Sequence, residues 1–153
     1  MKIISIQTGD MQIAVDAIFQ TGPVGSGIIT CLYDSHRNKG AISYSLFISP
    51  RKETQHLGLY LEKALPTLTK KLIAEGSDIA HISAKICGGA TILQPPPLLN
   101  WVEPFTEQIN EQLQKNSLLP AGYDLGGLAA RVVEFNCHTG KVLIKSGSTE
   151  MTL

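Results

Sequence analysis

Two stretches, Ile28-Ile29-Thr30-Cys31-Leu32-Tyr33 and Ala41–Ile48, decide the fold class, because each has the pattern of a β-strand. The first is continuously apolar or β-branched, which is typical of a buried strand. The second alternates, so one of its faces carries Ile42, Tyr44, Leu46 and Ile48 and the other carries Ser43, Ser45 and Phe47. With the polar turn Asp34–Gly40 between them, the two stretches predict consecutive strands.

Upstream of this pair, residues 2–7 and 11–15 are short runs rich in β-formers, separated by Gly9-Asp10. A Gly-containing turn between two such runs predicts a β-hairpin. Thr21–Gly27 is too rich in glycine and proline for regular structure and predicts a loop that leads into Ile28.

Downstream, apolar residues recur at the helical period from Leu57 to Glu75, and Gly76 closes the predicted helix. Pro66 should kink this helix or mark a later start. Ile79–Cys87 predicts a strand that stops at Gly88-Gly89. A second amphipathic helix is predicted from the apolar stripe of Trp101, Phe105, Ile109 and Leu113.

The remaining segments are connections and a closing hairpin. Pro95-Pro96-Pro97 predicts a stiff connector, and Asp124–Gly127 predicts a tight turn. Arg131–Phe135 and Lys141–Lys145 predict a hairpin. We therefore expect a single domain over residues 1–153, with a mixed α/β fold of two helices and mostly antiparallel sheets.

Composition narrows the class of protein. The chain has 153 residues, 43% hydrophobic and 17% charged, with 13 Lys+Arg against 13 Asp+Glu. This balance argues against disorder, against nucleic acid and against an anionic membrane as partner. The three separated cysteines indicate reduced thiols. The N-terminus lacks a signal-peptide pattern, and no stretch is long and apolar enough for membrane insertion. We expect a cytoplasmic protein.

The polar residues considered alone assemble no catalytic or metal site, and no cofactor is expected. The four histidines have no ligand spacing, and Cys137-His138 should point in different directions on a turn. Residues 22–27 have the wrong spacing for a nucleotide-binding loop. Asp34 and Asp124 are predicted to cap turns. A solvated helix face is predicted for Glu103, Glu107 and Glu111.

Three segments together resemble the CheD family of chemoreceptor glutamine deamidases. The first is Gly25–Asp34 followed by Gly40–Tyr44, and the second is Ala84–Ala90, similar to the family's alanine-lysine-x-x-glycine-glycine-alanine stretch. The third segment starts with Asp124-Leu125-Gly126-Gly127 and continues with Ala130-Arg131, Val133, Phe135 and Thr139-Gly140-Lys141. The resemblance implies a compact α/β/β sandwich.

The resemblance also implies an altered active site. The family's nucleophilic cysteine corresponds to Gly27 and its histidine base to Tyr44, whereas the accessory threonine is matched by Thr21. Glycine offers no nucleophile and tyrosine is a poor base at neutral pH. Tyr44 either fills space left by smaller neighbours or presents its hydroxyl to a ligand. The residues expected to form a binding site are Ser26, Gly27, Tyr44, Gly88 and Gly89.

Two functional hypotheses follow from this pattern. The first is a catalytically inactive CheD-like protein that binds chemoreceptor cytoplasmic helices or a CheC-like phosphatase. The second is an active protein-glutamine deamidase with a relocated nucleophile such as Cys87, since Cys31 would lie about 13 Å along a strand from Gly27. The stretches Pro95–Trp101 and Asn116–Tyr123 also depart from the family pattern, which puts the ordinary receptor substrate in question.

Overall fold

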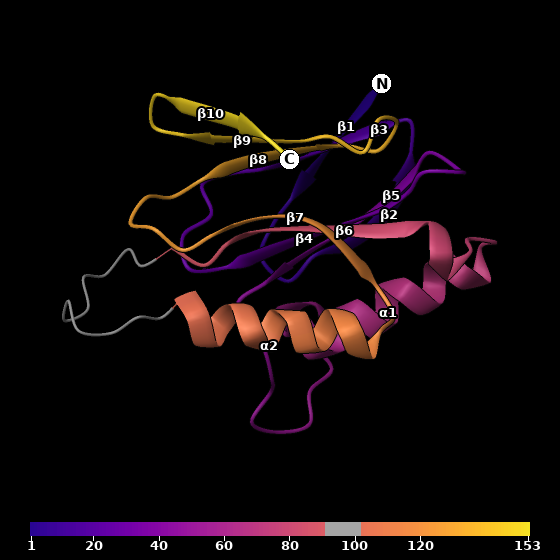
Figure 1. The fold of residues 1–153 in the computed structure, drawn as a ribbon, viewed down its shortest axis with the longest axis horizontal. Coiled ribbons are helices and arrows are strands. Elements are labelled where there is room, and N and C mark those ends of the chain that lie inside the picture. The colour runs from indigo at the N-terminus through magenta and orange to yellow at the C-terminus, as the bar shows by residue number, and fades with distance from the viewer. Residues whose placement is uncertain (91–101) are drawn as a thin grey trace.

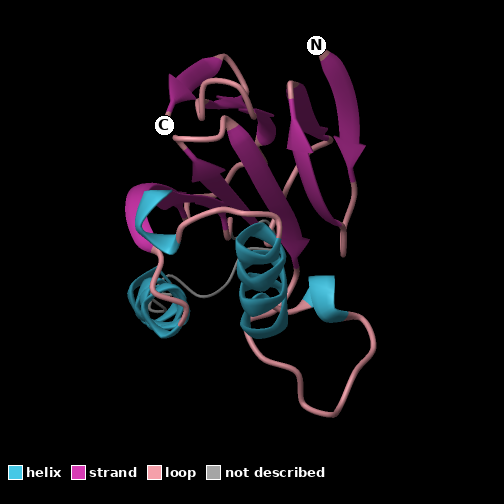
Figure 2. Cartoon of the chain, turned by 90° about the vertical axis from the view of Figure 1, so that its right-hand side faces the viewer, coloured by secondary structure: helices cyan, strands magenta, loops and turns pink. Residues whose placement is uncertain are grey.

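The protein is built as three layers, two β-sheets and a layer of helices (Figure 1). The computed structural model describes residues 1–90 and 102–153. Within them, the first sheet has the strand order β1-β3-β8-β9-β10 and the second has the order β2-β5-β4-β6-β7. The helices α1 and α2 lie against the second sheet, on the side away from the first sheet (Figures 1 and 2). This arrangement confirms the predicted mixed α/β fold.

The elements follow one another along the chain in this order: β1 (Lys2–Ile6), β2 (Met11–Val15), β3 (Ala17–Thr21), β4 (Ile28–Asp34), β5 (Lys39–Ser45), α1 (Leu61–Ala74), β6 (Ile82–Gly88), α2 (Val102–Lys115), β7 (Leu119–Leu125), β8 (Val132–Asn136), β9 (Val142–Ser146) and β10 (Thr149–Thr152). Among the described strands, β1–β3 and β6–β7 pair in parallel. The other strand pairs are antiparallel, as predicted.

Strand β4 is the centre of the second sheet, between β5 and β6. It is buried along nearly its whole length, because one face meets the first sheet and the other meets the helices. The core between the sheets includes Phe19, Ile29, Cys31, Ile42, Cys87 and Phe135. The core under the helices includes Ile28, Leu32, Ile86, Leu65, Leu72, Ile109 and Leu113. The continuous apolar pattern of residues 28–33 is therefore explained by burial on both faces.

The hairpin predicted for residues 2–7 and 11–15 is wrong. Strand β1 pairs in parallel with β3 in the first sheet, whereas β2 pairs with β5 in the second. Backbone hydrogen bonds hold the turn on β5 instead: Gly9 N donates to Tyr44 O at 2.7 Å, and Tyr44 N donates to Asp10 O at 3.1 Å. The chain therefore crosses between the sheets at this point. Strand β3, which the sequence analysis did not predict, completes the crossing.

One strand limit also differs from expectation, and two further strands were not predicted. Strand β5 ends at Ser45, so Leu46–Ile48 lie beyond the sheet. Strand β7 was missed, because the exposed residues Leu119, Pro120 and Ala121 give no alternating pattern. The predicted turn at Asp124–Gly127 therefore starts within β7, and its positive φ angles are at Gly126 and Gly127. Strand β10 was also missed, and all four of its residues are exposed.

The helices match the predicted periodicity with one shift. A short 3-10 turn occupies Leu57–Leu59, and α1 begins only at Leu61 and retains Pro66. The helix therefore starts later than its periodicity predicts, but Pro66 lies inside it and does not mark the start. In α2, Ile109 and Leu113 are buried as predicted, and Glu107 and Glu111 are exposed. The predictions for Pro95–Pro97 and Trp101 lie outside the described residues.

No described helix combines the length and the apolar character that a bilayer crossing would require.

Candidate functional site

The loop that precedes β4 meets the end of β6 through backbone contacts. Gly89 N donates to Gly27 O at 2.8 Å, and Ala90 N donates to Gly25 O at 3.1 Å. Gly88 has a φ of +114°, and a Cβ atom there would collide with the carbonyl oxygen of Gly27. Only glycine fits this crossing. The glycine pair predicted for the site is thus packed directly against the loop that carries Ser26 and Gly27.

Gly27 and Tyr44 face each other at this end of the second sheet. The first residue of β4, Ile28, pairs with Ser45, and so the two positions are close in space. A Cβ atom built on Gly27 would lie 2.6 Å from Cε1 of Tyr44 and 3.2 Å from the carbonyl oxygen of Ser45. The phenol ring thus occupies the space that a side chain at residue 27 would need.

The glycine at position 27 is required by space and not by backbone geometry. Gly27 is absent from the glycines with positive φ, so an L-residue meets no φ penalty there. Tyr44 is partly buried, and its hydroxyl makes no hydrogen bond to any of the residues that the structure describes. The Tyr44 ring therefore fills the space beside Gly27, and its hydroxyl is left able to hydrogen-bond to a ligand.

Thr21 has a structural contact at the edge of this site. Its side chain is buried, and its Oγ1 accepts a hydrogen bond from Val133 N at 3.0 Å. This bond joins the end of β3 to β8 in the first sheet. Ser26, in contrast, is exposed, although it directly precedes the buried Gly27. The structure thus brings Gly27, Tyr44, Gly88 and Gly89 together and gives Thr21 a partner in the neighbouring sheet.

Arg131 ties three loops together behind Gly27, a role that sequence reasoning did not assign. Its Nε lies 2.8 Å from Asp124 Oδ2, and its two terminal nitrogens donate to Gly88 O at 3.1 Å and Gly126 O at 2.6 Å. Its backbone exchanges two hydrogen bonds with Val24. The arginine side chain is only 8% exposed. In the sequence, the short separation of Arg131 from Asp124–Gly127 was the one available indication of this role. The contacts of its side chain become visible only in the fold.

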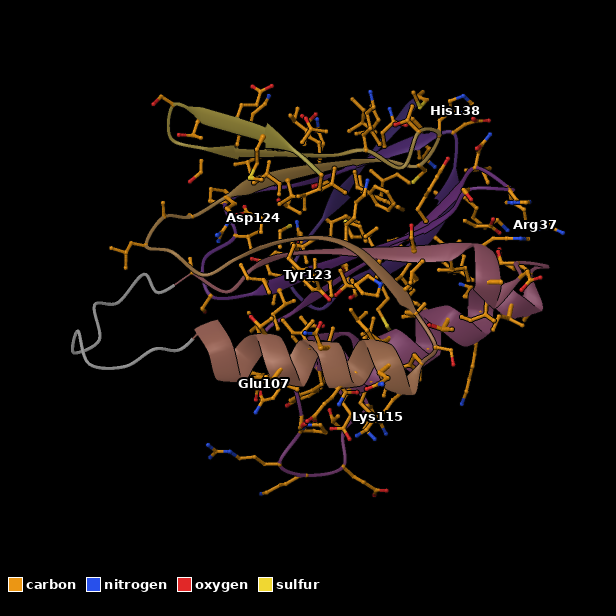
Figure 3. The ribbon with its side chains drawn as sticks, in the orientation of Figure 1. Arg37, Glu107, Lys115, Tyr123, Asp124 and His138 are labelled. Carbon is orange, nitrogen blue, oxygen red and sulfur yellow. The ribbon has the colours of Figure 1, made fainter. Side chains whose placement is uncertain are left out.

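The two aspartates predicted to cap turns have different roles. Asp34 Oδ1 accepts hydrogen bonds from the backbone nitrogens of His36 and Arg37, which confirms the capping prediction. Asp124 does not cap its turn, because its carboxylate binds Arg131. Its neighbour Tyr123 points to the opposite face of β7, where its hydroxyl binds Asn110 of α2 (Figure 3). The alternation of β7 therefore directs Asp124 toward the first sheet.

His36, His81 and His138 lie away from this site, in the turns at the opposite ends of the strands. Cys137 is buried and His138 is exposed, so the adjacent pair points in different directions, as predicted. The rings of His36 and His81 stack at 3.5 Å between centroids. Within residues 1–90 and 102–153, no three His, Cys, Asp or Glu side chains are grouped so that they could hold a metal ion.

Cys87 adjoins the site but lies inside the core between the sheets, where it is 1% exposed. Burial raises the pKa of its thiol to about 12, although the nearby Arg131 acts in the opposite direction. Burial likewise raises the pKa of Cys137 to about 12 and that of Cys31 well above its ordinary value. Because the thiolate is the nucleophilic form, these environments disfavour attack by any of the three.

We expect iodoacetamide to label Cys31, Cys87 and Cys137 slowly and at similar rates in the native protein at neutral pH. The physical reason is that each thiol must first become exposed and then ionise, and burial opposes both steps. Peptide mass spectrometry measures the rate at each position. The same protein unfolded in denaturant is the control, and there all three should react quickly. Fast labelling of Cys87 alone in the native protein would contradict this expectation.

Comparisons with known proteins agree with the resemblance seen in the sequence. The family model described as CheD chemotactic sensory transduction matches residues 47–146, a match that begins just beyond Tyr44. The chemoreceptor glutamine deamidase CheD of Thermotoga maritima is 29% identical over 122 residues, which cover 80% of this chain and 77% of that relative.

Two archaeal relatives extend this similarity over nearly the whole length. The probable chemoreceptor glutamine deamidase CheD of Archaeoglobus fulgidus is 27% identical over 144 residues, or 93% of this chain and 92% of the relative. That of Methanococcus maripaludis is 24% identical over 153 residues, or 99% of each. Since the family model spans more than half of the sequence and the relatives align along most of it, the chain belongs to the CheD family.

Proposed function

We propose that this protein binds the cytoplasmic helices of a chemoreceptor without deamidating them. The observation that carries the proposal is the position of the Tyr44 ring, 2.6 Å from the place where a Cβ of residue 27 would lie. In the resemblance to the family, these two residues stand where the nucleophile and the base are expected. The two positions are close enough for a nucleophile and a base to act together. Gly27 has no nucleophilic side chain, however, and Tyr44 has no imidazole.

Deamidation through a thioester needs a thiolate to attack the glutamine carbonyl and a proton donor for the departing ammonia. Gly27 supplies no nucleophile, and a phenol is a weak base at neutral pH. The hydrogen-bond donors that remain around a vacated site retain only about 10³-fold acceleration over water, which leaves the hydrolysis of an amide very slow. These chemical requirements support binding without turnover.

The scaffold around the site supports a retained binding role. Gly88 and Gly89 still pack on the Gly27 loop, and Arg131 still joins the surrounding loops. The names of the relatives give chemoreceptors as what those proteins act on, so a receptor helix is the partner that we propose. A CheC-like phosphatase is the second partner to test. The buried thiol of Cys87 does not favour a relocated nucleophile.

The test mixes the purified chain with a glutamine-containing cytoplasmic fragment of a chemoreceptor from the same genome. We expect saturable binding by calorimetry, and no conversion of glutamine to glutamate by intact-mass and peptide mass spectrometry. The Thermotoga maritima deamidase, assayed on its own receptor fragment, is the positive control for turnover. Conversion by the present chain would overturn inactivity, and its loss in Cys87→Ala would identify the relocated nucleophile. A lack of saturable binding would overturn the receptor as partner.

A further inference from the structure

Two consecutive apolar side chains are exposed directly beyond the candidate site. Strand β5 ends at Ser45, and the next residues, Leu46 and Phe47, are 37% and 54% exposed. The Phe47 ring stacks on Tyr60 at 5.6 Å between centroids. We call Leu46, Phe47 and Tyr60 the aromatic ledge. Ser45 directly precedes Leu46, and its carbonyl oxygen would contact a side chain at position 27. The aromatic ledge therefore begins next to the candidate site.

The aromatic ledge is held by backbone bonds at the base of a projecting loop. Leu46 N and Phe47 N both donate to Leu59 O at 3.0 Å, and Leu61 N donates to Phe47 O at 2.9 Å. The chain between Phe47 and Leu59 projects beyond the helix layer (Figures 1 and 2). The position of the two rings is therefore set by the start of α1 and the end of β5. An anchor that is already ordered loses little entropy when a partner binds.

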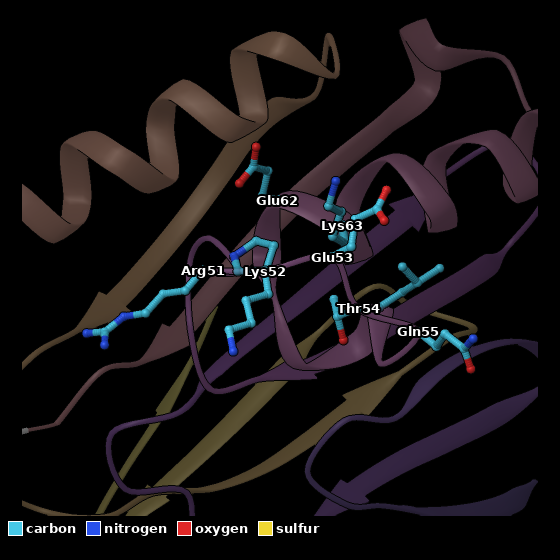
Figure 4. A pocket seen from close by; sticks show the side chains of 9 residues that line it. Arg51, Lys52, Glu53, Thr54, Gln55, Glu62 and Lys63 are labelled. Atoms are coloured by element: carbon cyan, nitrogen blue, oxygen red, sulfur yellow. The ribbon is translucent and has the colours of Figure 1, made fainter.

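A groove of about 570 Å³ lies between the aromatic ledge and the projecting loop. It is lined by the two rings of the aromatic ledge, Phe47 and Tyr60, and by Ser49, Arg51, Lys52, Glu53 and Thr54. Arg51 and Lys52 are exposed, and neither forms an ion pair or a side-chain hydrogen bond with any described residue. In the neighbouring pocket, which the same loop forms with the start of α1, both side chains point away from Glu62 and Lys63 (Figure 4). The groove thus combines two aromatic rings with the two cations Arg51 and Lys52 and the carboxylate of Glu53, so its lining carries a net positive charge.

We propose that the aromatic ledge and its groove are the docking surface for an acidic amphipathic helix of the chemoreceptor. This inference rests on the proposed function and names the surface and the type of helix that it would take. Phe47 and Tyr60 would pack against the apolar stripe of the helix, as aromatic anchors do at the centres of interfaces. Arg51 and Lys52 would face its carboxylates, which complements their charge and steers the encounter.

The position of the ledge relative to Tyr44 explains why binding and inactivity are compatible. Phe47 follows Tyr44 closely in the chain, just beyond the end of β5, so a helix seated on the ledge would pass near the candidate site. The anchors lie outside the Gly27–Tyr44 contact. Loss of the catalytic pair therefore leaves the docking surface untouched.

The test compares two variants of the surface with matched controls by calorimetry against the receptor fragment. Phe47→Glu should weaken binding by at least about tenfold, because it removes the central aromatic anchor and adds a charge. Its control is Ile3→Glu on β1, a residue of similar exposure (60%) in the other sheet. Arg51→Glu with Lys52→Glu should weaken binding severalfold and reduce its dependence on salt concentration. Its control is Lys70→Glu with Lys71→Glu on α1, which changes the net charge equally.

The outcomes separate this inference from the proposed function. If the wild-type chain binds the fragment and Phe47→Glu binds equally well, the docking surface is wrong and receptor binding stands. If the wild-type chain does not bind, both proposals fail. If sedimentation shows a dimer of the wild-type chain that Phe47→Glu dissociates, the occupant is a second copy and the helix assignment is overturned. Circular dichroism should show that every variant is folded, because all the substituted side chains are solvent-exposed.

Discussion

Gly27→Cys will lower the free energy of unfolding by about 1–3 kcal/mol, the usual cost of forcing extra atoms into a packed position. The reason is the contact of 2.6 Å between the new Cβ and Cε1 of Tyr44. Tyr44→His removes the phenol ring and substitutes a smaller imidazole. In that background the cost of Gly27→Cys should be clearly smaller, with a remainder from the Ser45 carbonyl oxygen at 3.2 Å.

A double-mutant cycle in urea measures this coupling directly, since residues in contact deviate from additivity. Gly27→Ala with and without Tyr44→His is the matched control, because alanine adds the same Cβ without a thiol. The coupling energy should be similar for cysteine and alanine. If Gly27→Cys cost the same stability with and without Tyr44→His, the ring would not restrict position 27, and the observation that carries the proposed function would be lost.

The same pair of substitutions also tests whether the site geometry is intact. Only the double variant places a thiol beside an imidazole, which is the arrangement that activates a cysteine nucleophile. We expect glutamine conversion in the receptor fragment to appear in the double variant and in neither single variant. Gly27→Ala with Tyr44→His should remain inactive. Turnover by the Gly27→Ala double variant would mean that another group performs the chemistry.

Arg131→Ala is expected to destabilise the protein by about 3 kcal/mol. The substitution removes the guanidinium donors to the carbonyl oxygens of Gly88 and Gly126 and leaves Asp124 without its cation. Gly88 O keeps the hydrogen bond from Gly126 N at 3.0 Å. The effect lies at the lower end of the range for a buried ion pair, because the Asp124 side chain is 24% exposed and water recovers part of its solvation. Chemical unfolding gives the free energy, and Arg131→Lys should recover only one of the lost contacts.

The surface pair of Lys39 and Glu75 provides the matched control for an ion pair of similar length. Its atoms are 3.0 Å apart and its side chains are 14% and 40% exposed. Glu75→Ala removes the 40% exposed partner and should therefore cost less than about 1 kcal/mol. A second readout is the labelling rate of Cys87, which should rise in Arg131→Ala as the loops around it loosen. An unfolding midpoint for Arg131→Ala equal to that of the wild type would show that the three loops are held by other contacts.

Elements with a strong local pattern could be predicted from the sequence. Strand β4 is continuously apolar, α1 repeats its leucines at the helical period, and the β8–β9 hairpin closes over a short turn. In each case the residues that specify the element are neighbours in the chain. The same is true of the Asp34 turn, where the carboxylate binds nitrogens two and three residues later.

Strand pairing over long separations could not be predicted in this way. Strands β1 and β2 have a turn between them, yet each finds a partner elsewhere, because the Gly9-Asp10 turn bonds to Tyr44 of β5. Strand β7 contains proline and glycine, and it becomes a strand through parallel pairing with β6. The residues of such an edge strand have a weak preference for the β conformation, and the backbone hydrogen bonds to the neighbouring strand stabilise it instead.

For the candidate site, the amino-acid sequence by itself determined the residue types: Gly27 and Tyr44 stand at the positions where the resemblance predicts the family's cysteine and histidine. Tertiary structure alone decided that the Tyr44 ring fills the space next to Gly27, that Arg131 joins the loops behind it, and that Phe47 leaves the sheet to form a ledge. The physical reason is that residue type is a property of one position, whereas contact, burial and free volume depend on segments that are brought together only by folding.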